Sequence, residues 1–321
     1  MRNDVGLLNK PNIIYEERKF VITETDVVVF LLWHLGDALN STALLPELAA
    51  RHNRKLVFAT TEQCVPILEN NPYLDTILVL DMEIPKHVSL GDWVKLQRLP
   101  QKYLPQNSTV YNLHIPINLR QTHLHIVECW AKTLGIEKPL SELKQTYFTR
   151  QSQSHKFRRG NVLILGNGGI TSQWSKHWPM ERWGTFIKKI KARFPELQLV
   201  QLGTENDPLL RGVEDLRGKT NIEESYHLLK LSKGCITNDS FLAHLAAASE
   251  CPVFVIFGPT SPAHFRPLGN GNIFTLGGHR YYAPCSRNLC RLTLGLIPCL
   301  AFPSVKEVFA KVETILVREK I

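Results

Sequence analysis

The segment at residues 234–262, GCITNDSFLAHLAAASECPVFVIFGPTSP, constrains the fold of this 321-residue chain more than any other. Its pattern predicts a short buried strand, an Ala-rich helix that begins after Asp239 and Ser240, and a second buried strand over residues 253–257. In such β-α-β units, ligands gather beyond the carboxyl ends of the strands, where helix N-termini present free N–H groups. Because Asp and Ser are also good N-caps, a capped helix without a ligand is the simpler alternative.

Two further polar loops follow buried strands elsewhere in the chain. Residues 166–179 have the sequence GNGGITSQWSKHWP, and residues 33–37, WHLGD, open the first expected helix. Three polar loops at strand ends in one α/β chain favour a phosphate-bearing ligand over a capped helix alone. The glycine fingerprints of P-loop NTPases and of dinucleotide-binding dehydrogenases do not occur, so neither class is indicated.

The composition is that of a globular protein, with 44% hydrophobic and 21% charged residues. The longest apolar run, residues 27–33, is far shorter than the ~20 residues that span a bilayer. The first 25 residues contain no apolar stretch of the kind found in a secretion signal. The seven cysteines are odd in number and scattered, which favours reduced thiols over a disulfide framework. We therefore expect a cytoplasmic protein.

The net charge of +9 suits a nucleoside-diphosphate ligand, an anionic glycolipid, a membrane surface or a nucleic acid. Lys and Arg are dispersed along the chain, and the sequence has no zinc-finger spacing, RNA-binding aromatic signature or basic helix. We therefore expect no nucleic-acid partner, whereas a nucleoside diphosphate, an anionic glycolipid and a membrane surface stay open as ligands.

Strands and helices alternate through two halves of the chain. In the first half we expect strands at residues 27–32, 55–59, 76–80 and 110–113 and helices at 38–52, 62–70, 86–98 and 125–134. Residues 149–160 are polar and basic and form the best linker. Outside the segment described first, the second half is expected to hold strands at 162–165 and 197–202 and helices at 180–194, 222–231 and 304–317. This order predicts an α/β fold with two domains, residues 1–155 and 156–321. As an alternative to packing within the second domain, the last helix packs back on the first domain.

Several sequence blocks follow one another along most of the chain: HLGDALNSTALLPEL, NNPYLDTILVLD, HIVECWAKTLGI, ITSQWSKHWPMERW, LGTEND, NDSFLAHLAAASECPVFVIFGPTSP and APCSRNLC. In this order they resemble glycosyltransferase family 9, the ADP-heptose:lipopolysaccharide heptosyltransferases. The resemblance implies a GT-B fold, in which two Rossmann-like domains face a central cleft, with the acceptor on the first domain and the nucleotide-sugar donor on the second. It also implies an inverting transfer that uses neither a metal nor a cofactor.

The resemblance places the family's catalytic base, the Asp of a G-D motif, on Asp37. Inversion requires a base to take the proton of the acceptor hydroxyl while its oxygen attacks the anomeric carbon in line. An aspartate is ionised at pH 7 and can serve without a large change in its acidity. The alternative is that Asp37 only caps a helix that begins at Ala38.

On the donor side, the family's threonine pair and the lysine before H-W-P fall on Thr171, Ser172 and Lys176. Hydroxyls and a cation suit diphosphate oxygens, and the cation would also offset negative charge on the leaving nucleotide. A solvated loop lysine is the alternative. The family's ribose-binding acid falls on Glu205, and Asp207 is the alternative residue for this role.

The family's D-T-G-x-x-H motif falls on Asp239, Ser240, Phe241 and His244. Ser240 keeps the hydroxyl, but Phe241 replaces a small residue that lets a phosphate approach the start of the helix. This departure leaves the identity of the sugar open. His244, one helical turn further on, is expected to reach donor oxygens, with packing on the helix face as the alternative.

Cys285, Cys290 and Cys299 follow a C-x4-C-x8-C spacing. Related sequences often carry cysteines here, and in the autotransporter heptosyltransferase branch they bind iron. A tetrahedral site needs four ligands, and only His279 is a nearby imidazole candidate. We expect free thiols and no metal.

These observations together predict a cytoplasmic glycosyltransferase that moves a heptose from ADP-heptose onto an acceptor hydroxyl, with peripheral association with the inner membrane as an option. The acceptor is a lipopolysaccharide core, another glycan or a protein. Two alternatives stay open: a transferase that uses a different nucleotide sugar, and a non-catalytic member that binds a nucleotide sugar.

Overall fold

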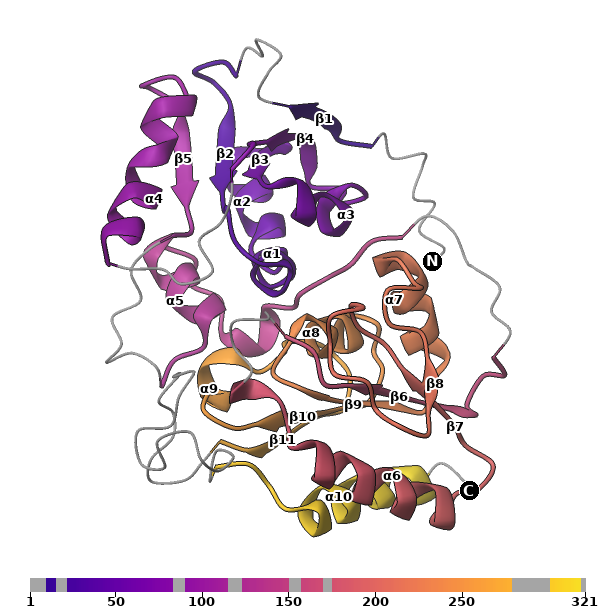
Figure 1. Ribbon diagram of the computed structural model, residues 1–321. Helices are drawn as coiled ribbons and strands as arrows, with labels where there is room; N and C mark the ends of the chain where they lie inside the picture. Colours follow the sequence, from indigo (N-terminus) through magenta and orange to yellow (C-terminus); the bar gives the residue numbers. More distant parts are fainter. Residues whose placement is uncertain are drawn as a thin grey trace. The chain divides into compact units, whose positions relative to one another are not determined.

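The computed structural model describes residues 10–15, 22–82, 90–114, 123–149, 157–169, 175–278 and 301–318 (Figure 1). The chain forms two compact units. The first comprises residues 1–118 and 127–150, and the second comprises residues 119–126 and 151–321. The short segment 119–126 therefore belongs with the second unit, although the chain on both sides of it belongs to the first.

The first unit contains a five-stranded parallel sheet in the order β1-β4-β3-β2-β5. Its strands are β1 (Asn12–Tyr15), β2 (Val27–Phe30), β3 (Leu56–Thr60), β4 (Leu74–Val79) and β5 (Thr109–Asn112). Its helices are α1 (Leu35–Ser41), α2 (Leu45–His52), α3 (Val65–Leu68), α4 (Leu90–Tyr103) and α5 (Ile126–Thr133), with short 3-10 turns at Glu62–Cys64 and Leu140–Glu142. β2 is buried along its whole length, as its continuous apolar pattern predicts for a strand covered on both faces.

The prediction of one helix over residues 38–52 is wrong, because the chain forms α1 and α2 with a turn between them. Ser41 Oγ donates to the carbonyl of Ala38, and Thr42 Oγ1 donates to the carbonyl of Leu39, both at 2.7 Å. Such side-chain bonds to backbone carbonyls compete with regular helical bonding. Pro46 then occupies the first turn of α2, a position that proline favours.

The second unit contains a six-stranded parallel sheet in the order β11-β10-β9-β6-β7-β8. Its strands are β6 (Val162–Gly166), β7 (Gln198–Gln201), β8 (Glu214–Asp215), β9 (Gly234–Asn238), β10 (Val253–Phe257) and β11 (Ile273–Gly277). Its helices are α6 (Met180–Arg193), α7 (Ile222–Leu231), α8 (Phe241–Ala248), α9 (Pro262–Phe265) and α10 (Val305–Arg318). The predicted β-α-β unit is confirmed as β9, α8 and β10.

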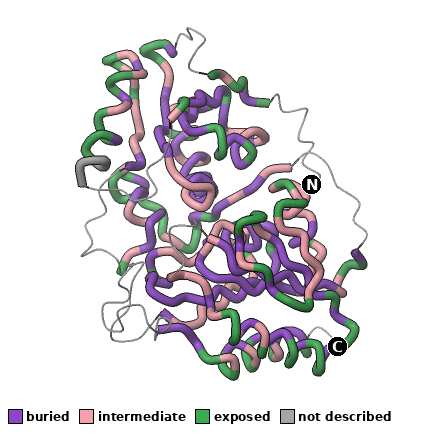
Figure 2. The backbone as a smooth tube through the Cα atoms, in the orientation of Figure 1, coloured by how far each residue is buried: buried purple, intermediate pink, exposed green. Residues whose placement is uncertain are grey.

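An aromatic core anchors the helices of the second unit. The rings of Trp178, Trp183 and Phe186 pack edge to face, with centroids between 5.1 and 6.1 Å apart. Val308 and Val312 of α10 belong to the same buried cluster, so the last helix packs against α6 within its own unit. Figure 2 shows burial concentrated in the strands and exposed residues along α6 and α10. Within the described ranges, no helix has the length and apolarity needed to cross a membrane.

Candidate functional site

Each sheet contains a reversal of strand order next to its central strands, and the polar loops follow the strands at these reversals. In the second unit, β6, β7 and β8 extend one way and β9, β10 and β11 extend the other, so the reversal lies between β6 and β9. In the first unit, β2, β3 and β4 extend one way while β5 pairs with the other edge of β2. Ligands of open α/β sheets bind at such reversals, outside the carboxyl ends of the strands. The loops at residues 33–37, 166–179 and 238–240 all start there.

Asp37 lies in the first turn of α1 and is not its N-cap. The helix begins at Leu35 with His34 in the N-cap position, so the suggestion that Asp37 caps a helix from Ala38 is wrong. The N–H groups of Asp37 and Ala38 both donate to the carbonyl of His34 at 3.0 Å, which explains the early start. A carboxylate in the first turn still gains from the helix dipole.

Buried polar groups surround the loop that carries Asp37. The N–H of Leu32 donates to His114 Nε2 at 2.9 Å, and His114 Nδ1 donates to Asn112 Oδ1 at 2.8 Å. Burial lowers the pKa of His114 to about 4, so its ring is neutral at pH 7. Burial raises the pKa of Cys64 to about 11, and the charge of Asp37 adds to this increase, so the thiol stays protonated. His114 and Cys64 are therefore both uncharged at pH 7.

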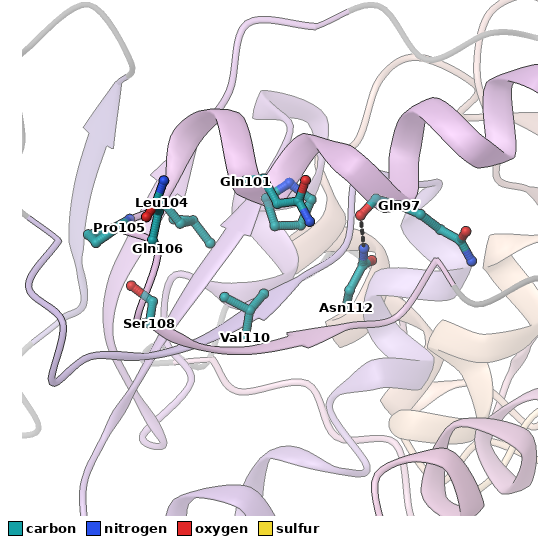
Figure 3. A pocket seen from close by; sticks show the side chains of 9 residues that line it. Gln97, Gln101, Leu104, Pro105, Gln106, Ser108, Val110 and Asn112 are labelled. Carbon is teal, nitrogen blue, oxygen red and sulfur yellow. Dashed lines mark hydrogen bonds between the residues drawn. The ribbon is translucent and has the colours of Figure 1, made fainter.

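A cavity of about 490 Å³ opens between α4 and β5 in the first unit (Figure 3). Pro100 lies inside α4 and has no N–H, which leaves the carbonyl of Leu96 without its usual helical partner. Asn112 Nδ2 reaches the carbonyls of Leu96 and Gln97, each at 3.4 Å. The lining residues are all uncharged: Gln97, Pro100, Gln101, Leu104, Pro105, Gln106, Ser108, Val110 and Asn112. A lining without a cation does not suit a diphosphate.

In the second unit, the side chain of Asn167 connects the start of the Gly-rich loop, residues 166–179, to its end. Its Oδ1 accepts the N–H of Trp178 at 3.0 Å, and its Nδ2 donates to the carbonyl of Trp178 at 3.1 Å. The start of the loop is thereby held to Trp178, two residues before the start of α6. Thr171 and Ser172 lie outside the described residues, so their predicted contact with phosphate stays a prediction.

Lys176 forms an ion pair with Asp239 just before the start of α8. Lys176 Nζ lies 3.0 Å from Asp239 Oδ2, in an approach that lacks the angle of a hydrogen bond. The carboxylate side chain is only 7% exposed, whereas the lysine side chain is 21% exposed. The ammonium also lies 5.7 Å from the centroid of the Phe265 ring, within the range of a cation–π contact. The structure thus places Lys176 beside Asp239, two residues of the predicted donor site that are far apart in sequence.

Three other predicted donor residues lie in or next to α8. Ser240 is its N-cap by backbone conformation, but its Oγ lies 3.2 Å from Thr237 Oγ1 and makes no capping bond. Phe241 is the first helical residue and is half-buried, so the helix start carries a ring in place of a small side chain. His244 is buried, and burial lowers its pKa to about 4 although nearby Asp239 opposes this decrease.

Three buried polar atoms near these strand ends have no protein hydrogen-bond partner in the described structure: Asn238 Oδ1, Thr260 Oγ1 and His177 Nε2. Asn238 Nδ2 donates to the carbonyl of Gly168 at 2.5 Å, which links β9 to the loop after β6. A Cβ at Gly169 would lie 3.8 Å from both Asn238 Nδ2 and His177 Nε2, so these two side chains flank that glycine. Polar atoms without partners are costly when buried, and they cluster at ligand sites. Residue type and spacing did not predict any of the three.

The two acids after β7 have different surroundings. Asp207 is buried, and its Oδ2 accepts the N–H of Thr204 at 2.8 Å. Arg217 NH1 donates to the backbone carbonyl of Asp207, and Arg217 Nε donates to Asp215 Oδ1 at 2.8 Å. Glu205 is exposed in the same loop. Asp207 is therefore used in holding the turn, and Glu205 is the acid that can turn toward a ligand.

Metal ligation has no support in the described parts of the chain. No group of three or more His, Cys, Asp or Glu side chains there could hold an ion. Cys285, Cys290, Cys299 and His279 lie outside the described residues. Of the cysteines that are described, Cys64, Cys129, Cys235 and Cys251 are free thiols.

Solved structures share the fold of this chain over most of its length. A family 9 glycosyl transferase from Veillonella parvula has a TM-score of 0.68 at 18% identity and covers 93% of this chain and 99% of its own. The E. coli ADP-heptose lps heptosyltransferase II has a TM-score of 0.60 at 18% identity, with 92% and 100% covered. The iron-containing dodecameric heptosyltransferase TibC, in complex with ADP-D-β-D-heptose, has a TM-score of 0.61 at 14% identity, with 90% and 76% covered. With its two parallel α/β units, the chain has the GT-B fold of glycosyltransferases.

The family follows from the sequence match. The model described as glycosyltransferase family 9 (heptosyltransferase) matches residues 111–294, and the chain belongs to this family. Lipopolysaccharide heptosyltransferase 1 of Pseudomonas aeruginosa is 27% identical over 202 residues, which are 58% of this chain and 53% of that protein. Lipooligosaccharide heptosyltransferase 2 of Haemophilus influenzae is 43% identical over 56 residues, 17% of this chain and 16% of that protein. The chain thus matches about half or less of the length of these two relatives.

Proposed function

We propose that this protein is an inverting, metal-independent glycosyltransferase that moves a heptose from ADP-heptose to an acceptor hydroxyl. The observation that carries the proposal is the Lys176–Asp239 pair at the start of α8, beside the reversal of strand order between β6 and β9. This is where an open α/β sheet binds a ligand, and an ammonium there suits a diphosphate. Membership of family 9 and the ADP-heptose bound to TibC support the choice of donor.

In the proposed reaction, the acceptor oxygen attacks the anomeric carbon of the donor from the side opposite the diphosphate. The new C–O bond forms as the bond between the anomeric carbon and the diphosphate oxygen breaks. The hydroxyl proton goes to the carboxylate of Asp37, and the electron pair leaves with the nucleoside diphosphate. Lys176 offsets the charge that develops on this leaving group, as preorganised cations do at transferring phosphates.

The acceptor is a hydroxyl of a lipopolysaccharide core, another glycan or a protein. The names of the relatives favour lipopolysaccharide biosynthesis, and the net charge of +9 favours peripheral contact with an anionic membrane surface. Phe241 at the first position of α8 supports one alternative, a different nucleotide sugar, because the helix start carries a large side chain instead of a small one.

A panel of nucleoside diphosphates tests the donor site directly. We expect ADP to raise the melting temperature of the protein more than UDP, GDP or CDP at equal concentration. A ligand at 100 times its Kd stabilises the folded state by about 2.7 kcal/mol. If no nucleoside diphosphate changes the melting temperature, the donor-site proposal is wrong. If another base has the largest effect, the alternative donor is correct. Binding without turnover over a panel of sugars and acceptors would favour a non-catalytic member.

The two acids after β7 give a second prediction. Glu205→Gln is expected to weaken ADP binding by about tenfold, because a hydrogen bond to a charged group contributes roughly 1.5–3 kcal/mol. The loss should be much smaller for 2′,3′-dideoxy-ADP, which has no ribose hydroxyls to bind. Asp207→Ala should instead lower the free energy of unfolding by about 1–3 kcal/mol, because it removes the acceptor of the Thr204 N–H. Loss of ADP affinity in a fully stable Asp207→Ala protein would assign the ribose to Asp207.

A further inference from the structure

Two histidines join segment 123–126 to the region of α9 through reciprocal hydrogen bonds. His264 Nδ1 lies 2.6 Å from the carbonyl oxygen of Leu124, and His125 Nε2 lies 2.7 Å from the carbonyl oxygen of Arg266. The partners are 140 and 141 residues apart in sequence. Both histidines belong to the second unit, and both are at most 2% exposed. We call these four residues the histidine clasp.

The clasp fixes the protonation of both rings. A carbonyl oxygen only accepts, so His264 carries its proton on Nδ1 and His125 carries a proton on Nε2. Burial lowers the pKa of His264, and it lowers the pKa of His125 to about 3, so both rings are neutral at pH 7. Each bond therefore depends on one particular ring nitrogen.

The short helix α9 needs outside support. It has only four residues, Pro262–Phe265, and its N-cap Ser261 makes no side-chain capping bond. A single helical turn is not stable by itself, so its position depends on tertiary contacts. The clasp supplies two hydrogen bonds, one from within α9 and one to the residue that follows it.

The residue next to His264 contacts the lysine of the proposed donor site. The Phe265 ring lies 5.7 Å from Lys176 Nζ, which is paired with Asp239 Oδ2 at 3.0 Å. The negative charge of Asp239 opposes the effect of burial on the pKa of His264. A lysine side chain has several rotamers, and holding one of them costs conformational entropy. Contacts with both a fixed ring and a carboxylate restrict the position of the ammonium.

We propose that His264 and His125 are positioning residues of the donor site: by fixing α9 they hold Phe265 against Lys176 and keep the ammonium where it meets a nucleoside diphosphate. The inference rests on the proposed function, since it concerns the lysine assigned to the donor. It assigns a role to two buried histidines that the reaction itself does not use.

Asparagine and glutamine substitutions test the bond geometry. The amide nitrogen of Asn, like Nδ1 of His, is bonded to the atom attached to Cβ, whereas the amide nitrogen of Gln lies farther out, as Nε2 does. His264→Asn should therefore keep the bond to Leu124 and rescue the affinity for ADP, whereas His264→Gln should weaken binding about three- to tenfold, the usual coupling between neighbouring groups. At His125 the order should reverse, with Gln retaining affinity and Asn losing it.

A double mutant separates positioning from general damage to the fold. If His264 acts through Lys176, then His264→Gln should change the affinity for ADP by less than about twofold once Lys176 is alanine. Equal losses in both backgrounds would overturn the inference, as would unchanged affinity in both His264→Gln and His125→Asn. Thermal unfolding identifies variants that fail to fold. If His264→Gln does not fold, the comparison of His125→Gln with His125→Asn tests the inference instead.

The same measurements distinguish this inference from the proposed function. If wild type binds ADP and Lys176→Ala binds it weakly, while the histidine variants bind normally, only the positioning role is wrong. If wild type does not bind any nucleoside diphosphate, both proposals fail.

Discussion

Replacing Asp37 with asparagine is expected to lower the rate of glycosyl transfer by about 10²–10⁴-fold, the usual contribution of a general base. Asparagine has the size of aspartate but cannot accept the proton of the attacking hydroxyl. The affinity for ADP should stay within about twofold of wild type, because Asp37 lies in the first unit and the proposed donor residues lie in the second. Single-turnover measurements at saturating donor and acceptor isolate this step from binding.

Folding should change little in this variant. Asp37 does not cap α1, so substitution costs no capping bond, and the loss of its interaction with the helix dipole is worth about 0.3–1 kcal/mol. Asp37→Ala should therefore resemble Asp37→Asn in both stability and rate, whereas an N-cap residue would lose more with alanine than with asparagine. Near-normal turnover in Asp37→Asn would show that the base lies elsewhere in the chain.

The main architecture could be predicted because buried parallel strands have a clear sequence pattern. β2, β6, β9 and β10 consist mostly of apolar residues followed by polar loops, and each is completely buried. β1, β8 and β11 were missed for physical reasons. β1 and β11 are edge strands that are only partly covered, and β8 has just two residues, so none shows the continuous apolar pattern of a central strand.

The site was less predictable because much of it depends on contacts between distant segments. Lys176 and Asp239 were each predicted from local motifs, but their ion pair follows from the adjacency of β6 and β9. His125 and His264 had no local signal, since the atoms they bind are 140 residues or more away. The early start of α1 follows from backbone bonds to His34, which the G-D motif does not reveal.

Replacing Lys176 with alanine is expected to weaken ADP binding by about ten- to hundredfold, since a charge-assisted contact is worth roughly 1.5–3 kcal/mol. The affinity for adenosine, which has no phosphates, should hardly change. Lys188→Ala is the matched control, because Lys188 is an exposed lysine on α6. Calorimetric titration of both variants with both ligands shows whether the loss is specific to the diphosphate.

The ion pair with Asp239 adds a second consequence that can be measured separately. Lys176→Ala leaves a carboxylate that is 7% exposed without its cation, and an unpaired buried charge is destabilising. Adding Asp239→Asn removes that charge, so the double variant should regain stability in thermal unfolding. It should not regain the affinity for ADP, because the ammonium that meets the diphosphate is still absent. Affinities for ADP within twofold of wild type in both the single and the double variant would show that Lys176 only balances Asp239 and does not bind the donor.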